Sequence, residues 1–391
     1  MIRPGQCLLT MKQYLLSKKP YRFHTKPLLL CLFSGLMSGC LGESEGSDGN
    51  SHSQGQLLPS GISGLSYQTA STTGTTDANG RFDYYEGETL QFSVGDLLLT
   101  TGVPADEMIT PLEFFDELRS QLETSPVNSE GLLDHRLTEQ ALLEDPTLIN
   151  MTRFLMALNW QDSIQEGEGI EIRQRVIDQL NAALPTLEQG IDFSVGPVTF
   201  AAVGLNPSPA NILLGKICFY DDIDERCQEP PTQEQIDLAP ERPINEEDID
   251  PDTVYREDLI SKRDRIVNSR RDLTRFSVEK AEDFLTRELD EITRLFANRY
   301  YLDSETASHP ATDTAIHSIH VRQIGSAPTL DAMEAVSLRD SEVTIHAYDW
   351  QSATVEYFVT GESGGESDLL INFRPQESYR WIKKQLRVII R

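Results

Sequence analysis

The most constraining feature of the sequence is its first 40 residues, because they decide in which compartment the rest of the chain folds. Residues 18–26 are basic, residues 27–37 form an apolar run of eleven residues, and the small residues Ser38 and Gly39 follow. A charged segment, a short apolar segment and small residues in this order are typical of a secretory signal. An apolar run this short does not span a hydrocarbon core, which takes about 20 residues. The sequence therefore predicts a signal peptide at residues 1–39 that is removed on export.

The end of this segment reads Leu36, Met37, Ser38, Gly39 and Cys40. It resembles the lipobox of bacterial lipoproteins, with Met37 at the place where that family usually has leucine. The resemblance implies that the thiol of Cys40 receives a diacylglycerol and that the chain is cut just before it. A membrane is then a partner of the mature protein through this lipid. The alternative is an ordinary signal peptide with a chance cysteine.

The residue after the cysteine bears on where such a lipoprotein goes. It is Leu41 rather than aspartate, which in the lipoprotein family favours sorting to the outer membrane. We therefore expect an outer-membrane lipoprotein, on the periplasmic side or at the cell surface. The leader is long, and Met11 begins a more typical one, so Met1 and Met11 both remain candidates for the first residue.

The charge of the chain limits its partners. Its 391 residues include 62 acidic and 34 basic side chains, for a formal net charge of −28. Residues 1–39 hold six basic residues and no acid, so the body is more acidic than the whole chain. A body of this charge repels phosphate groups, and we expect no nucleic-acid partner. A solvated acidic surface is the simplest interpretation.

Composition divides the chain into five segments. They are a signal peptide (1–39), a Gly/Ser-rich flexible tether (40–56), a β module with a helical extension (57–203), an acidic, proline-rich linker (204–252) and a helix-plus-meander domain (253–391). The fold class expected from this order is α+β, with a small antiparallel β module, then a long helix and an antiparallel β meander.

In the β module, apolar and polar residues alternate over about 57–105, and Asn79-Gly80 is a strong hairpin signal. Thr110 as N-cap and Pro111 at the first helical position predict the start of a helix. Further helices are expected at about 137–144, 146–159 and 170–184.

Residues 61–185 resemble a module found in many bacterial envelope lipoproteins and large adhesins. That module reads Gly-x-x-Tyr-x-Thr, Thr-Asp-x-x-Gly-x-Phe-x-Tyr, Gly-Asp, Thr-Pro-Leu, Asn-x-x-Arg-Phe-Leu and Gly-Ile-x-Ile. The matching residues are 64–69, 76–84, 95–96, 110–112, 150–155 and 169–172. The resemblance implies a structural signature and no catalytic residues.

The last segment begins with a helical pattern from Thr253 to about Tyr301. Ser277, followed by acidic residues, is a second N-cap and predicts two helices there. After Asp303 the pattern becomes that of β-strands.

Two cysteines and three acids are the candidate sites of the linker. Cys218 and Cys227 would close a small disulfide loop in an oxidising compartment. Asp248, Asp250 and Asp252 are spaced like the start of a calcium loop. The later residues depart from that loop, because Thr253 replaces its glycine and Leu259 its bidentate glutamate. A solvated acidic linker is the alternative to calcium binding, and no other cofactor is indicated.

Histidines and a basic cluster give weaker signals. His317 and His320 are three residues apart on a predicted strand and therefore face opposite sides, whereas His320 and His346 could meet across strands. Ordinary strand histidines are the better interpretation. The basic cluster at residues 262–275 is best explained as a helix face that pairs with the acids of the protein itself.

Three functions fit these patterns. The leading hypothesis is a non-catalytic envelope protein that binds a protein or small-molecule ligand. The second is a periplasmic carrier or transport-accessory protein, and the third a hydrolase with an unrecognised carboxylate site. A deep apolar pocket would favour the carrier, and a polar pocket with paired carboxylates of raised pKa would favour the hydrolase.

Overall fold

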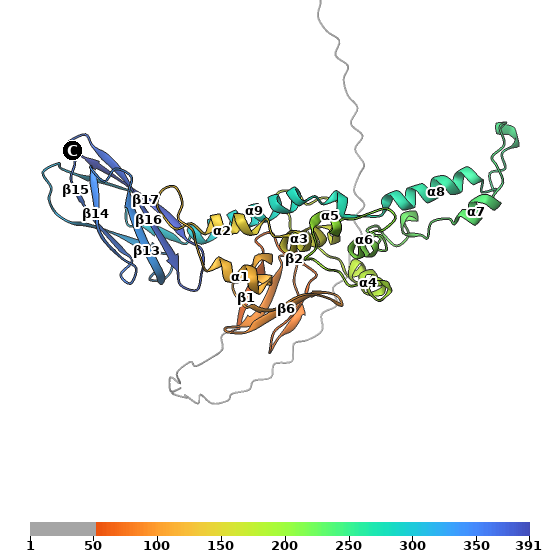
Figure 1. The fold of residues 1–391 in the computed structure, drawn as a ribbon, viewed down its shortest axis with the longest axis horizontal. Coiled ribbons are helices and arrows are strands. Elements are labelled where there is room, and N and C mark those ends of the chain that lie inside the picture. Colours follow the sequence, from red (N-terminus) through yellow and green to blue (C-terminus); the bar gives the residue numbers. More distant parts are fainter. Residues whose placement is uncertain (1–51) are drawn as a thin grey trace, which may run out of the picture. The chain divides into compact units, whose positions relative to one another are not determined.

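The computed structural model describes residues 52–391, and within them the fold is α+β, as predicted (Figure 1). A first β block is followed by helices, and a second β block closes the chain. The predictions for the signal peptide, for Cys40 and for most of the tether lie outside the described residues.

The first β block contains three small sheets. One has the order β5-β1-β8, with β5 at Arg81–Tyr85, β1 at His52–Leu57 and β8 at Met108–Ile109. The second has the order β4-β3-β6-β7, at Thr73–Thr75, Ser66–Gln68, Thr89–Val94 and Leu97–Pro104. The third pairs β2 (Ile62–Ser63) with β9 (Ile170–Glu171). Alternation sets the buried face, because Leu90, Phe92 and Val94 of β6 are all buried.

The Asn79-Gly80 pair makes a turn but no hairpin, which differs from the expectation. The turn joins β4 to β5, yet β4 pairs with β3 and β5 pairs with β1. Gly80 has a φ of +73°, and a Cβ there would lie 2.6 Å from the backbone nitrogen of Ile62. The Asp77 carboxylate accepts the backbone N–H groups of Asn79 and Arg81. Because the turn packs against the chain around Ile62, the chain passes at this turn from one sheet to another.

The helical extension follows the predicted signals closely. Thr110 caps the short 3₁₀ helix η1 (Pro111–Phe114), and the Glu113 carboxylate accepts the backbone N–H of Thr110 in return. The helices that follow are α1 (Asp116–Leu122), α2 (His135–Leu142), α3 (Pro146–Leu158), α4 (Gln174–Ala183), the 3₁₀ turn η2 (Leu184–Thr186), α5 (Pro197–Phe200) and α6 (Pro209–Leu214). The helix expected from residue 170 begins at Gln174, because residues 170–171 form strand β9.

The Asn-x-x-Arg motif of α3 ties distant loops to the core. The Asn150 amide donates to the carbonyls of Phe193 and Val195, at 2.9 and 2.7 Å. The Arg153 guanidinium donates to the carbonyls of Phe276 and Leu273. Both side chains are buried, so the motif satisfies backbone groups that would otherwise be buried without partners.

The segment predicted as a linker is partly core. Leu213, Leu214 and Ile217 are buried with the helical extension. The rest of the segment carries the turns η3 (Glu225–Cys227) and η4 (Glu246–Asp248) and helix α7 (Gln233–Leu238), which contacts α8 (Arg256–Ser269).

The long helical region is two helices, as predicted from Ser277. Its hydroxyl accepts the Lys280 N–H at the start of α9 (Val278–Ala297), after the turn η5 (Leu273–Arg275). Helix α9 does not pack only on the strands that follow it. Phe284, Leu285 and Leu289 lie in the first core. We define this core as the contiguous cluster of buried apolar side chains that extends from Leu57 to Leu289. The division between the two cores therefore falls near residue 300 rather than at residue 253.

The last strands form two four-stranded sheets. One has the order β10-β12-β15-β14, at Tyr300–Leu302, His317–Gln323, Thr354–Val359 and Val343–Asp349. The other has the order β11-β17-β16-β13, at Thr306–His309, Ile382–Ile390, Glu366–Pro375 and Leu330–Ser337. Consecutive strands β14–β15 and β16–β17 pair antiparallel, whereas β13 pairs with β16 and β12 with β15.

These two sheets share a second core, defined as the buried apolar side chains between Tyr300 and Val388. Val355 and Tyr357 come from one sheet, and Leu369, Ile371 and Phe373 from the other. We call this part, residues 300–391, the sandwich. No helix among residues 52–391 is long and apolar enough to cross a membrane.

Candidate functional site

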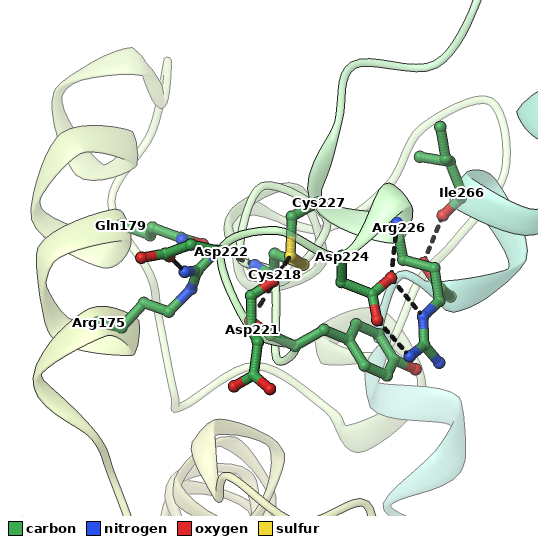
Figure 2. Close-up of a disulfide and its surroundings, with 11 residues drawn as sticks. Arg175, Gln179, Cys218, Asp221, Asp222, Asp224, Arg226, Cys227 and Ile266 are labelled. Carbon is green, nitrogen blue, oxygen red and sulfur yellow. Dashed lines mark hydrogen bonds and ion pairs between the residues drawn. A yellow bond between two sulfur atoms is a disulfide. The ribbon is translucent and has the colours of Figure 1, made fainter.

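Cys218 and Cys227 form a disulfide in the structure (Figure 2). The Cys218 N–H donates to the Gln179 side chain of α4 at 2.6 Å, and Cys218 is buried. Asp222 in the loop forms an ion pair with Arg175, also on α4. The disulfide loop is therefore fastened to the helical extension.

The three acids proposed for calcium are not brought together. Among the described residues, Asp248, Asp250 and Asp252 do not form a group of converging ligand atoms. Both carboxylate oxygens of Asp250 accept local hydrogen bonds, from the Asp252 N–H at 3.0 Å and the Thr253 hydroxyl at 2.9 Å. These bonds build a turn before α8, so the spacing of the acids is explained without an ion.

The basic cluster is divided among internal partners. Arg265 pairs with Glu225, and Lys262 donates to Gln228. Arg271 is 3% exposed; it forms an ion pair with Asp162 and donates to the carbonyls of Ala157, at the end of α3, and Trp160, just after it. This agrees with pairing inside the protein.

The histidines considered from the sequence do not meet as a group. The His320 ring lies 2.7 Å from the Asp303 carboxylate. In the register of β12, β15 and β14, His320 lies opposite Thr354, whereas His346 sits at an irregularity beside Tyr357. His317 instead contacts His309 and Asp313, two residues that the sequence analysis did not single out.

A cleft of about 450 Å³ lies between the β module with its helices and the sandwich. Polar and charged side chains from η1, α1, β12, β13, β16 and neighbouring loops line most of it. They include Asp106, Glu107, Glu113, Arg119, Glu123, Arg299, Gln323, Asp331, Arg374, Glu377, Tyr379 and Arg380. The Glu107–Arg299 ion pair joins the β7–β8 loop to the connection between α9 and β10 at this cleft.

A buried ionic network adjoins the cleft, and three of its residues, Glu113, Tyr379 and Arg380, belong to the lining. Arg380 is 4% exposed, and its guanidinium lies 3.9 Å from the Glu113 carboxylate and 3.6 Å from that of Glu139 on α2. The Tyr379 hydroxyl donates to Glu139 at 2.8 Å and accepts from Arg380 at 2.6 Å. Residues of the β16–β17 turn are thus bonded to helices more than 200 residues earlier in the chain.

A buried histidine belongs to the same network. The Trp381 backbone N–H donates to Nδ1 of His135 at 3.0 Å, and Nε2 lies 3.2 Å from the Thr293 hydroxyl. Nδ1 therefore accepts, so we assign the proton of the neutral ring to Nε2. Burial, with help from the Arg380 charge, lowers the pKa of His135 to about 3, which keeps the ring neutral.

Burial has the opposite effect on the acids. It raises the pKa of Glu139 to about 7, against the opposing effects of Arg380 and the Tyr379 hydrogen bond. Burial also raises the pKa of Glu113. Both carboxyls are committed to protein groups, because Glu113 binds Thr110 and Arg380 while Glu139 binds Tyr379 and Arg380. The two carboxyls therefore join η1 and α2 to the β16–β17 turn, and neither is free to act as a general acid or base.

Other polar atoms at the cleft lack protein partners. Among the described residues, the side-chain oxygen of Gln323 and the Nε atoms of Arg374 and Arg380 are buried and make no hydrogen bond. Glu377, also at the cleft, has a φ of +61°, which is rare for a residue with a side chain. Unpaired buried polar groups and strained backbone concentrate at binding sites, so the cleft is the best candidate for a functional site.

Sequence reasoning could not find this site. In the sequence, Glu113 stands three residues after the N-cap Thr110, and Tyr379 and Arg380 stand just before the last strand. Neither position marks these residues as members of a site. His135 and Trp381 are 246 residues apart, and no local spacing connects them. Only the packing of the sandwich on the helices brings these groups together.

Comparison with known proteins adds little. No protein-family model matches the chain, and no curated protein matches it. Solved structures that match in part include domains 4 and 5 of the S-layer protein SbsC and domains 1–6 of the surface layer protein SbsC. Each is 13% identical with a TM-score of 0.18; the matches cover 23% and 24% of this chain and 50% and 13% of those chains. Scores this low carry no argument about fold or function.

Proposed function

We propose that the chain is an envelope lipoprotein, held on the outer membrane by a lipid on Cys40, whose body binds a polar ligand or partner in the cleft and performs no catalysis there. The lipidation part is supported by the lipobox resemblance at residues 36–40. The disulfide between Cys218 and Cys227 supports export, because disulfides persist in oxidising compartments.

The observation that carries the binding proposal is the set of unpartnered polar atoms at the cleft, on Gln323, Arg374 and Arg380. Gln323 offers an acceptor and Arg374 a donor, and neither is satisfied by the described residues. A ligand with both donors and acceptors would complete them. The polar lining does not suit the apolar cargo of a carrier, and the buried carboxylates are already paired with Arg380, which argues against the hydrolase.

Site-specific photocrosslinking in cells of the source organism tests the binding proposal. A photoreactive amino acid replaces Glu123, an exposed residue at the cleft. The matched control replaces Glu362, an exposed residue of the loop between β15 and β16. We expect an adduct, identified by its mass, at Glu123 and not at Glu362. Equal labelling at the two positions, or none at either, would contradict a ligand in the cleft.

Protease accessibility of intact cells separates the two envelope functions. With a tag after Arg391, degradation while a periplasmic control protein survives would favour binding of an external ligand. Protection until the outer membrane is opened would favour the periplasmic carrier or accessory protein, which is the second candidate.

A further inference from the structure

A cluster of metal-ligand side chains lies in the sandwich, away from the cleft. His309 ends β11, Asp313 lies in the following turn, and His317 begins β12. One ligand atom from each residue lies within 4.8 Å of the other two. The two imidazole rings stack with centroids 3.7 Å apart and an angle of 23° between their planes.

The carboxylate of the cluster is oriented by the backbone. Oδ1 of Asp313 accepts the Ala315 N–H at 2.9 Å. Its other oxygen, Oδ2, faces the histidines, 3.1 Å from Nε2 of His317 and 3.8 Å from Nδ1 of His309. One oxygen is therefore held by the backbone, while the other is within hydrogen-bond distance of His317 and faces the His309 ring.

One histidine has the outer hydrogen bond that metal-bound imidazoles usually have. Nε2 of His309 lies 3.0 Å from the hydroxyl of the buried Tyr357. When Nε2–H donates to that hydroxyl, Nδ1 carries a free lone pair directed at Asp313. Such outer partners fix the tautomer and the ring orientation of a metal ligand.

Strand pairing holds the two histidines in place. His309 lies opposite Ile390 in the parallel β11–β17 pair, and its carbonyl accepts the Arg391 N–H at 2.9 Å. His317 lies opposite Tyr357 in the β12–β15 pair. The donors thus come from both sheets of the sandwich, and ligands on paired strands are positioned more exactly than ligands on loops.

We propose that His309, Asp313 and His317 form a binding site for a divalent metal ion of the zinc type. Two imidazole nitrogens and one carboxylate oxygen are a ligand set that Zn²⁺ takes, with a fourth position open to water or a partner group. The set does not suit Ca²⁺, which prefers six to eight oxygen ligands. The bound ion would fasten the connection between the two sheets.

Calorimetric titration with Zn²⁺ tests the site in the full chain, purified without a polyhistidine tag and stripped with a chelator. We expect saturable binding that is at least tenfold weaker in His309→Ala and in His317→Ala. Asp313→Asn should also weaken binding, while its amide oxygen can still accept the Ala315 N–H and preserve the turn. His320→Ala and His346→Ala are matched controls and should bind like the unchanged chain, since His320 pairs with Asp303.

Thermal unfolding and X-ray absorption give independent readouts. Zn²⁺ should raise the unfolding temperature of the unchanged chain and not that of Asp313→Asn, and the absorption spectrum should show two imidazole ligands. If a histidine variant fails to fold, Asp313→Asn alone decides the question. Equal binding by the unchanged chain and by these variants, or no saturable binding up to about 100 μM free Zn²⁺, would overturn the proposal.

Discussion

The positive charge of Arg380 compensates the negative charges of two buried carboxyls. Glu113 and Glu139 approach it from η1 and α2, and all three side chains are buried or nearly so. A buried ion pair adds little net stability by itself, but removing one partner leaves an uncompensated charge. The role of Arg380 is therefore to make the junction of helices and sandwich specific.

Replacing this arginine should be costly. Arg380→Met is expected to lower the free energy of unfolding by about 3–5 kcal/mol, as measured by urea denaturation. The matched control is Arg387→Met on β17, whose partner Glu366 is partly exposed. That change should cost at most about 1 kcal/mol. Similar losses in the two variants would show that the buried network is not what holds the junction.

The pH dependence of stability should have two opposite components. The folded-state pKa of His135 is about 3, below its usual 6.5, so its contribution is full above pH 6.5 and is lost as the pH falls toward 3. The folded-state pKa of Glu139 is about 7, above its usual 4.5, so its contribution is full below pH 4.5 and is lost as the pH rises through 7. At about 1.4 kcal/mol for a pKa difference of one, the contribution is roughly 5 kcal/mol for His135 and roughly 3 kcal/mol for Glu139.

Two variants separate these components in urea titrations between pH 4 and 8. His135→Asn, whose side-chain oxygen can accept the Trp381 N–H, should flatten the loss on the acid side. Glu139→Gln should reduce the loss of stability that occurs as the pH rises from 4.5 through 7. An unchanged pH profile in either variant would show that the other groups of the chain set that limb.

At the scale of the elements, a glycine of the β module serves close packing. Gly64 has a φ of +87°, and a Cβ there would lie 2.0 Å from the carbonyl oxygen of Ile172. Both residues flank the β2–β9 pair, which joins the first β block to the segment between α3 and α4. Together with Asn150 and Arg153, these residues explain the module signature by packing and backbone satisfaction.

The disulfide should stabilise the junction of α6 with the segment before α7. In the chain-entropy view, closing a loop of this size contributes about 2–3 kcal/mol. The double variant Cys218→Ala, Cys227→Ala should unfold at lower urea and be cut faster by protease between residues 220 and 232. Reductant should affect the unchanged chain in the same way and leave the double variant unaffected. A reductant effect of equal size on the double variant would assign the change to another cause.

Helix α9 should unfold with the first core. Phe284→Ala removes a side chain that is 1% exposed and should cost about 3–5 kcal/mol. Hydrogen exchange should show a larger loss of protection in α3 and β6 than in β16. Phe373→Ala, in the second core, is the matched control and should show the reverse. The same pattern of loss in the two variants would mean that the cores do not behave as separate units.

At the scale of the whole molecule, the acidity of the chain bears on the proposed anchor. The whole chain has a formal charge of −28, and a body this acidic repels anionic surfaces. Attachment to a membrane, as we propose it, would then come from something other than the charged body. A diacylglycerol on Cys40 would supply it through the Gly/Ser-rich tether.

Removing the anchoring thiol should change the location of the whole protein. Cys40→Ser is expected to abolish labelling by a fatty-acid analogue and to move the protein from the membrane fraction to the soluble fraction of lysed cells. Cys31→Ser, in the apolar part of the leader, is the matched control and should stay in the membrane fraction. Membrane retention and labelling of Cys40→Ser would refute the anchor.

Local chemistry made part of this structure predictable. The fold class followed from the order of periodic patterns, the caps at Thr110 and Ser277 from their side chains, and the break between α8 and α9 from the second cap. These features depend on residues within a few positions of one another, and such interactions are visible in a sequence.

Tertiary packing decided the rest. At the Asn79-Gly80 turn the chain passes from one sheet to another because the turn packs against the chain near Ile62. The cleft, its Arg380 network and the His309–Asp313–His317 cluster depend on strand pairing and on contacts between distant segments. A sequence determines which groups can bind and cap locally, but which distant groups share a buried site depends on how the two cores close, and no local spacing records that.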